Sequence, residues 1–139
     1  MTSKLHSNYH DPDLIIDVIK HQLFELKLEF IDLYLIHSPW GHVPASAEVL
    51  EHFGTQNLYV DNKPVIRDFD HRLMWAKLEH AVDLGLVKFI GVSNFDECQI
   101  DHIVKQCKIK KCLQLTFRGV EPYATRFEIY DCQQVLKTF

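Results

Sequence analysis

The sequence has 139 residues, of which 47% are apolar, and a formal net charge of −4 with histidine neutral. These values are typical of one globular domain, and the acidic balance argues against a surface for nucleic acid or for an anionic membrane. No apolar run approaches the ~20 residues that a membrane-spanning helix needs, and the first residues are too polar for a secretory signal. We therefore expect neither a membrane nor a nucleic-acid partner.

The cysteines and histidines give no indication of a metal site. The four cysteines have no CxxC spacing, which favours reduced thiols in a cytoplasmic protein over a disulfide framework. Nine histidines include the pairs His6/His10 and His37/His42, but no carboxylates or cysteines accompany them at regular spacing. We expect no bound metal. The cysteines are Cys98, Cys107, Cys112 and Cys132.

The first predicted elements are a strand end at 2–5, a helix from Asp11 to about Lys27, and a buried strand over 30–36. Asp11 is a typical N-cap, and Pro12 suits the first helical position because its missing N–H would have no partner there. Apolar residues then recur at helical spacing. The segment 30–36 is short and mostly apolar, as in a strand buried on both faces, and Ser38-Pro39 ends it.

Residues 38–69 are predicted to form a long polar loop. The segment contains three prolines and Gly54 and has no sustained periodicity. A loop of this length inside a compact domain usually carries function or is partly disordered. The sequence leaves both interpretations open. The prolines are Pro39, Pro44 and Pro64.

The second half of the chain repeats the alternation of helix and strand. The periodicity predicts helices over 70–84, 96–107 and 127–136, and strands over 86–92 and 111–116. Gly85 is placed to end the first of these helices in a left-handed conformation. The resulting order, βαβαβαβα, predicts a parallel sheet with right-handed crossovers, which fits both a (β/α)8 barrel and an open doubly wound sheet. No Gly-rich phosphate loop follows a strand, which counts against a doubly wound nucleotide-binding fold.

Ser93 and Asn94 stand where the strand 86–92 ends and a helix begins. In parallel α/β proteins the loops at the carboxyl ends of the strands surround the ligand site. A hydroxyl and a carboxamide at this position are suited to hydrogen-bonding another carboxamide. The same residue types also cap helices, so spacing alone leaves both interpretations open.

His37 and Lys4 each follow or end a predicted strand. A neutral His37 at the carboxyl-end face could donate to a carbonyl oxygen and polarise it, or it could simply terminate the strand. Lys4, taken alone, is an ordinary solvated charge near the start of the chain. These residues therefore become candidates only with further support.

Three motifs, in the same order along the chain, resemble the aldo-keto reductases. They are Thr2–Leu5 (TSKL), Phe30–Pro39 (FIDLYLIHSP) and Met74–Phe95 (MWAKLEHAVDLGLVKFIGVSNF). The resemblance extends from about residue 2 to at least Gln114 and implies an α/β fold of parallel (β/α) units from a TIM-type (β/α)8 barrel. About four of eight units would be present, so 1–139 would form a partial barrel domain with its long loop at 38–69.

The resemblance also implies roles for individual residues. Lys4 and His37 match two of four catalytic residues, whereas no tyrosine or aspartate here matches the other two, which lie upstream in the family. Ser93, Asn94 and Gln114 match the residues that hold the nicotinamide carboxamide, although Leu113 departs from the family's pattern beside Gln114. Trp40 would fall near the substrate pocket, or it would only anchor the loop.

The implied activity is the NADPH-dependent reduction of small aldehydes and ketones to alcohols, with NAD not excluded. The chain looks like the middle of such an enzyme, so we expect it to be weakly active or inactive alone. The alternative is a non-catalytic half-barrel that acts as a binding or self-association module. Four strands of a barrel expose two edges and the interior layer, which favours self-association through the open barrel face.

Overall fold

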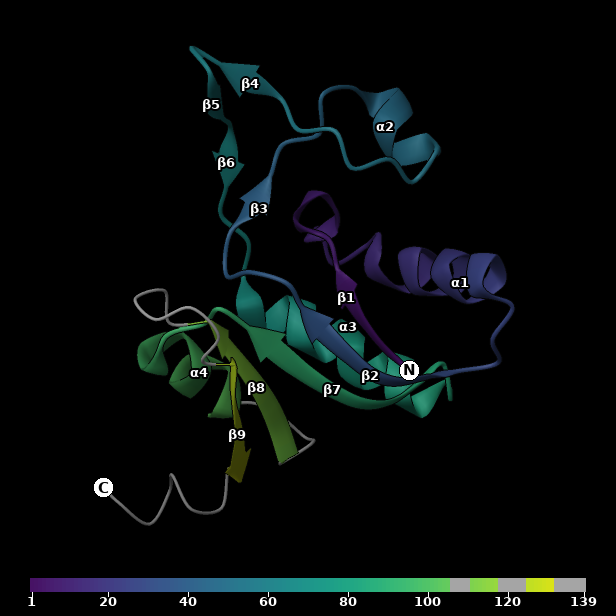
Figure 1. Cartoon of the computed structure of the whole chain (residues 1–139), viewed down its shortest axis with the longest axis vertical. Helices are drawn as coiled ribbons and strands as arrows, with labels where there is room; N and C mark the ends of the chain where they lie inside the picture. Colours follow the sequence, from purple (N-terminus) through teal and green to yellow (C-terminus); the bar gives the residue numbers. More distant parts are fainter. Residues whose placement is uncertain (106–110, 118–124, 132–139) are drawn as a thin grey trace.

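The computed structural model describes residues 1–105, 111–117 and 125–131, and for the last two ranges it describes the backbone alone. Five strands form the main sheet in the order β1-β2-β7-β8-β9 (Figure 1). The first four run parallel to one another, and β9 pairs antiparallel with β8. The strands are β1 (Thr2–Leu5), β2 (Ile31–Ile36), β7 (Val87–Ser93), β8 (Lys111–Phe117) and β9 (Thr125–Asp131).

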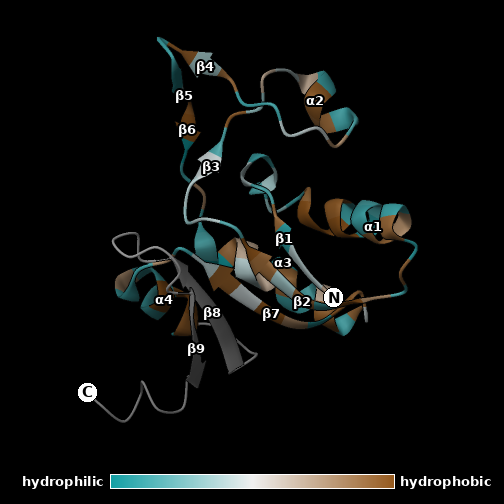
Figure 2. Cartoon of the chain, viewed as in Figure 1, coloured by the Kyte–Doolittle hydropathy of each residue, from teal (hydrophilic) through white to brown (hydrophobic). Residues whose placement is uncertain are grey.

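Three helices cover one face of the sheet. These are α1 (Ile15–Leu26), α3 (His71–Asp83) and α4 (Glu97–Val104), and α3 contacts α1, α4 and β7. Alternate strand residues such as Tyr34, Ile36, Ile90 and Val92 are buried in one apolar core with residues of these helices. Apolar residues accordingly concentrate along β2, α3 and β7 (Figure 2). Within the described residues, no helix combines the length and apolar character needed to cross a bilayer.

None of the described helices lies over the other face of the sheet. Because side chains alternate along a strand, Leu33 and Leu35 of β2 and Phe89 and Gly91 of β7 share this second face. They pair directly, Leu33 with Phe89 and Leu35 with Gly91. Phe89 is 66% exposed. Leu35, further along the same face, is 1% exposed, so this face, called the open face below, is exposed around Phe89 and buried toward the carboxyl ends of the strands. In a closed barrel it would line the interior.

The start of α1 differs from the prediction. Asp11 Oδ1 accepts from the backbone N–H of Asp13 at 3.1 Å, and Leu14 N–H donates to the Asp11 carbonyl at 3.0 Å. These bonds form a separate turn, and the helix begins at Ile15. The assignment of Asp11 as N-cap and Pro12 as first helical residue is wrong. The Asp11 side chain accepts from a backbone N–H of this separate turn and not from an N–H of the first helical turn.

The end of α3 agrees with the prediction for Gly85. Gly85 has φ +73°, and its N–H donates to the Val82 carbonyl at 2.9 Å. The next residue, Leu86, donates to the Ala81 carbonyl at 3.0 Å. This pair of bonds is a Schellman motif, in which a residue without Cβ adopts the left-handed conformation at little cost. The turn leads directly into β7.

The segment 38–69 contains short elements of its own: β3 (Gly41–His42), α2 (Ala47–Glu51), β4 (Tyr59–Val60), β5 (Lys63–Pro64) and β6 (Ile66–Arg67). Strands β4 and β5 form a hairpin that projects away from the main sheet (Figure 1). Its tip, Asp61-Asn62, has φ of 50° and 59°, as a type I′ turn requires. At its base β3 pairs with β6, so the predicted loop is partly built from paired strands.

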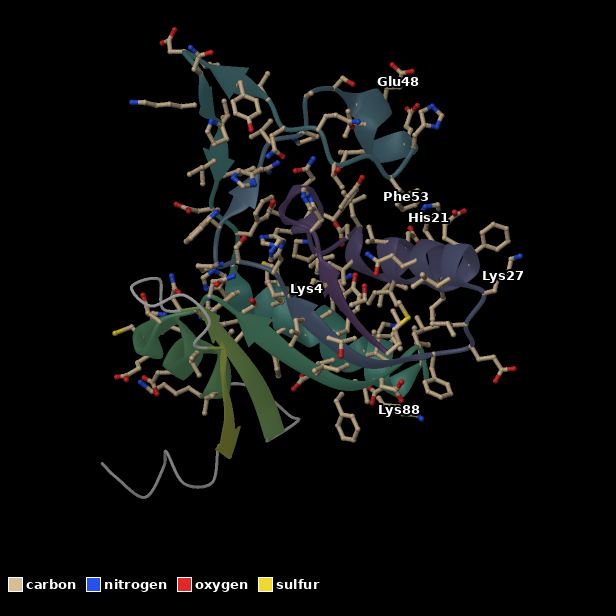
Figure 3. The ribbon with its side chains drawn as sticks, in the orientation of Figure 1. Lys4, His21, Lys27, Glu48, Phe53 and Lys88 are labelled. Carbon is tan, nitrogen blue, oxygen red and sulfur yellow. The ribbon has the colours of Figure 1, made fainter. Side chains whose placement is uncertain are left out.

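The 3-10 turn η1 (Ser7–Tyr9) and helix α1 hold the long segment in place. The Tyr9 hydroxyl donates to the Gly54 carbonyl, and Asn8 Nδ2 donates to the Gln56 carbonyl at 3.0 Å. Phe53 stacks on His21 of α1, with ring centroids 3.9 Å apart and planes 7° from parallel (Figure 3). These contacts position the segment over the carboxyl ends of the first strands.

The C-terminal prediction is wrong. A helix over 127–136 would have completed a fourth β/α unit, but residues Thr125–Asp131 form the strand β9. In its register Leu113 of β8 lies opposite Ile129. Apolar and polar residues alternate from Arg126 to Glu128 and Ile129, which is the period of a strand, and aromatic and β-branched residues favour that state. Residues 132–136 and Cys107 of the predicted helix 96–107 lie outside the described residues.

Candidate functional site

Three neighbouring parallel strands bring Lys4, His37 and Ser93 to one edge of the sheet. Lys4 of β1 pairs with Leu35 of β2, and the His37 N–H donates to the Leu5 carbonyl at 3.2 Å. Ser93 is the last residue of β7, the strand on the other side of β2. Lys4 lies on β1 (Figure 3) and alternates with Leu5, which belongs to the helix-covered core, so Lys4 faces the other side of the sheet. Residues from separate parts of the sequence therefore converge at the carboxyl ends of the strands.

Asn94 connects the ends of β2 and β7. It has φ 64°, a left-handed conformation that asparagine adopts more readily than most residues. Its Nδ2 donates to the His37 carbonyl at 2.8 Å and to Ser93 Oγ at 3.1 Å, and Ser93 is completely buried. Both donor hydrogens of the carboxamide are thus used within the site, and Oδ1 is left as an acceptor.

The capping interpretation of Ser93 and Asn94 is wrong. The N-cap of α4 is Asp96, whose side chain accepts from the Gln99 N–H at 2.8 Å. The Asp96 N–H in turn donates to Gln99 Oε1 at 3.0 Å, which completes a capping box. The helix therefore has its own cap two residues further along, and Ser93 and Asn94 serve the strand ends.

His37 is partly exposed at this edge, and its surroundings favour the neutral imidazole. Partial burial lowers the pKa of His37 below its ordinary value of 6.5, and the nearby charges of Lys4 and His42 lower it further. A neutral imidazole can donate one N–H to a carbonyl oxygen without carrying a charge. The site can therefore orient and polarise a carbonyl group near neutral pH.

More histidines gather at the same edge than the sequence indicated. The ring of His6 lies 6.3 Å from the ring of His37, and His42 Nδ1 lies 2.6 Å from Ser7 Oγ. His10 is completely buried, and burial together with His71, His6 and His37 lowers its pKa to about 3. The described residues contain no group of three or more His, Cys, Asp or Glu side chains that could hold a metal ion.

Only one signal in the sequence could have revealed this histidine group. His6, His10, His37 and His42 all lie within six residues of the end of β1 or β2, and parallel neighbours bring such positions together. His71 joins from α3, where its Nε2 lies 2.6 Å from the Pro39 carbonyl oxygen. The sequence gives no indication of that contact, because it joins the two ends of the long segment.

Trp40 and Gln114 are placed less completely than the other candidates. Ser38 Oγ donates to the Trp40 carbonyl at 2.7 Å, which fixes the backbone just beyond His37. The Trp40 side chain itself is 44% exposed. In β8, Gln114 pairs with Val92, and the next pair joins Leu115 to Ser93. The backbone of Gln114 therefore lies beside the end of β7, and its side chain is outside the described part.

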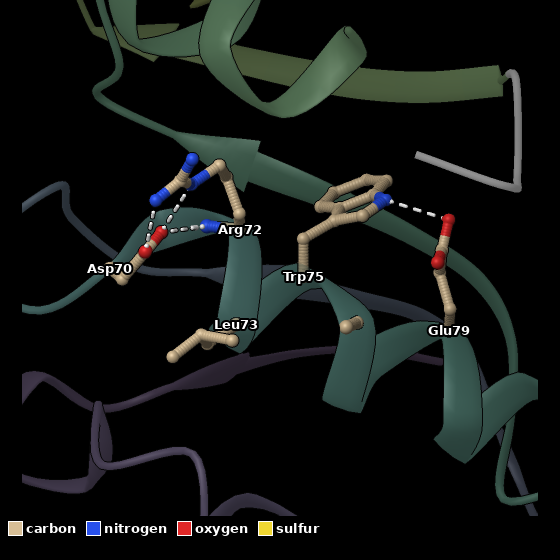
Figure 4. A pocket seen from close by; sticks show the side chains of 6 residues that line it. Asp70, Arg72, Leu73, Trp75 and Glu79 are labelled. Carbon is tan, nitrogen blue, oxygen red and sulfur yellow. Dashed lines mark hydrogen bonds and ion pairs between the residues drawn. The ribbon is translucent and has the colours of Figure 1, made fainter. Parts of the chain in front are cut away.

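A pocket along α3 lies apart from these strand ends. Its lining consists of Asp70, which directly precedes the helix, and of the helix residues Arg72, Leu73, Trp75, Ala76 and Glu79 (Figure 4). Trp75 Nε1 donates to Glu79 Oε1 at 3.1 Å, and Arg72 binds Asp70 through two nitrogens. The ion pair lowers the Asp70 pKa to about 2. These pairs use the polar side-chain groups of Asp70, Arg72, Trp75 and Glu79 as hydrogen-bond partners of one another. None of the residues that line the pocket stands at a strand end.

Comparisons with known proteins agree with this arrangement. The model of the Aldo/keto reductase family matches residues 1–121. The chain is 33% identical to an aldose reductase of Encephalitozoon cuniculi and 34% identical to aldo-keto reductase family 1 member C3 of Homo sapiens, and each match covers 94% of this chain. It covers 40% and 38% of the lengths of these two relatives.

A solved structure also shares the fold. The aldose reductase of Schistosoma japonicum superposes with a TM-score of 0.72 and 32% sequence identity, over 83% of this chain and 36% of that protein. The described elements therefore correspond to about a third of a longer reductase structure.

Proposed function

The chain belongs to the aldo/keto reductase family, and we propose from this premise that it is the central part of an NADPH-dependent enzyme that reduces aldehydes and ketones to alcohols. The observation that carries the proposal is the convergence of Lys4, His37, Ser93 and Asn94 at adjacent strand ends. Each of these residues matches the family's motifs, and together they form one edge of the sheet.

In this proposal Lys4 and His37 are catalytic residues. The neutral His37 ring donates to the carbonyl oxygen of the substrate and orients it. The ammonium of Lys4 favours the ionised form of a neighbouring tyrosine and so makes it a better acid. The family pattern places that tyrosine and an aspartate on a segment upstream of β1. Trp40 borders the substrate and contributes to its fit.

Ser93, Asn94 and Gln114 hold the nicotinamide carboxamide. Asn94 Oδ1 accepts from the amide NH2 of the cofactor, since Nδ2 is committed to the His37 carbonyl and to Ser93 Oγ. When bound, the nicotinamide supplies the hydride to the carbonyl carbon. We propose NADPH as the cofactor. NAD is the alternative, because residues 1–139 contain no match to the family's basic motif that binds the 2′-phosphate of NADPH. The proposed compartment is the cytoplasm.

The alternative function is a non-catalytic half-barrel that associates with itself. The observation that favours it is the open face, where Phe89 is 66% exposed next to Leu33. Two copies could bury these residues against each other in a symmetric interface. A variant with Phe89→Lys should then shift light scattering from a dimer or larger species to a monomer. A monodisperse monomer in the unchanged chain would contradict this alternative.

The test of the enzyme compares residues 1–139 with a chain extended by the family's upstream and downstream segments. The isolated chain should bind NADPH weakly, because each lost charge-assisted contact costs about 1.5–3 kcal/mol. It should not oxidise NADPH with benzaldehyde. The extended chain should do so, and His37→Ala should reduce its turnover by about 100-fold or more. His52→Ala, an exposed histidine at the end of α2, is the matched control.

Strong activity from residues 1–139, or low-micromolar NADPH binding by them, would contradict the proposed function. So would an active extended enzyme that is indifferent to His37→Ala.

A further inference from the structure

Two histidines that the proposed function does not use flank His37. His6 follows directly after β1, and its ring lies 6.3 Å from the ring of His37 at a tilt of 54°. His42 belongs to β3, which contacts η1, and its Nδ1 lies 2.6 Å from Ser7 Oγ. Because Ser7 occupies Nδ1 of His42, Nε2 is the ring nitrogen left to meet a ligand. The three rings come from three different elements around one strand edge.

The charged groups that act on this edge are all basic. Beyond burial, His37 and His42 act on His6, while Lys4 and His42 act on His37. His10, which is buried behind them, is influenced by His71, His6 and His37. No carboxylate of the described residues contributes to the pKa shift of any of these three rings.

Three acidic residues that lie close to these elements along the chain are engaged elsewhere. Asp11 accepts from the Asp13 N–H, Asp70 is paired with Arg72, and Asp96 caps α4. These three carboxylates therefore do not compensate the basic groups of this edge: Lys4 from β1, His6 and His10 around η1, His37 from β2, His42 from β3 and His71 from α3. A site with uncompensated basic groups and imidazole donors attracts an anion.

We propose that His6 and His42 line the substrate side of the site and select carbonyl compounds that also carry a carboxylate group. The inference rests on the proposed function, in which His37 receives the carbonyl oxygen. His6 and His42 donate to the carboxylate, which lies on the same side of the carbonyl as these two rings. They determine specificity and take no part in hydride or proton transfer. The bound anion favours protonation of His6, whose pKa lies below its ordinary value, so binding takes up a proton.

The test uses the chain of residues 1–139 and two probes of the same shape, benzoate and benzamide. Histidine ring signals are followed by NMR in a cationic buffer, without NADPH. Benzoate should shift the signals of His6, His37 and His42. Its binding should tighten as the pH falls below 6.5, because the pKa of His6 and that of His37 lie below this ordinary value. Benzamide should leave these signals unchanged.

Variants assign the effect to the two histidines. His6→Gln and His42→Gln should each weaken benzoate binding by about tenfold or more, because each removes one charge-assisted hydrogen bond. His80→Gln, at an exposed position of α3, should leave the affinity unchanged. If one of the two variants fails to fold, the other still tests the inference.

Equal responses to benzoate and benzamide, or full benzoate affinity in both variants, would overturn the inference. These outcomes are independent of reduction. An extended enzyme that reduces benzaldehyde while the histidines ignore benzoate would keep the proposed function and remove this inference. Benzoate binding without any NADPH-dependent reduction would do the reverse.

Discussion

The two faces of the main sheet are made by the same strands, yet they differ in how much of their surface the chain buries. Ile90 faces the helices and is 1% exposed, whereas its neighbour Phe89 faces the other way and is 66% exposed. The covered face is completed by α1, α3 and α4, which are close in sequence to the strands they cover. The open face would need strands from elsewhere. The candidate site lies at the carboxyl ends of the strands of this sheet, where the second face is buried at Leu35 and Ser93.

The largest expected effect is a difference in the free energy of unfolding between substitutions at two adjacent residues of β7, one on each face of the sheet. Ile90→Ala removes packed apolar atoms from the core and should lower the free energy of unfolding by about 2–5 kcal/mol. Phe89→Ala should lower it by less than about 1 kcal/mol in a monomer, since the ring is largely in water. Urea unfolding of both variants at low protein concentration measures the difference. An equal loss at Phe89 would show that this face is covered.

The second effect is a pH dependence that originates in the buried His10. Its pKa is about 3 when folded and near 6.5 when unfolded, so the unfolded chain binds the proton first as the pH falls. The stabilisation present above pH 6.5 should be lost between about 6.5 and 3, at about 1.4 kcal/mol per pH unit from this group. Urea unfolding at several pH values should show that His10→Gln flattens this slope.

The matched control for His10 is His80, which is exposed on α3. His80→Gln should keep the slope of the unchanged chain. If His10→Gln also keeps it, His10 is not the neutral buried group that the structure indicates.

The smallest effect should come from the bridge between the strand ends. Asn94→Gly keeps the left-handed backbone but removes the hydrogen bond to the His37 carbonyl, and should cost about 0.5–1.5 kcal/mol. Asn62→Gly is the control, because Asn62 is left-handed at a hairpin tip, where glycine is equally favoured. It should change the stability by less than about 0.5 kcal/mol in urea unfolding. A loss at Asn62 as large as at Asn94 would contradict the bridging role.

The sequence by itself determined the elements whose signals are local. The strands over 30–36, 86–92 and 111–116 and the left-handed Gly85 follow from apolar runs and turn chemistry within a few residues, and the structure has them within one residue at each end. The placement of Ser93 and Asn94 at a strand end has the same origin. The segment 125–131 was also readable as a strand from its alternation, but a short apolar segment fits a helix almost as well, and its pairing with β8 decides the matter.

Only the tertiary structure decided how the site is assembled. Asn94 donates to the carbonyl of a residue 57 positions away, and His42 meets Ser7 across 35 positions. Such contacts depend on which strands pair and in which register, and the local periodicity of the sequence does not determine this pairing. Asp96 rather than Asn94 caps α4 for the same reason, since the strand end uses Asn94 for the contact with β2. Periodicity fixes what each segment becomes, and the pairing of parallel strands fixes which side chains meet.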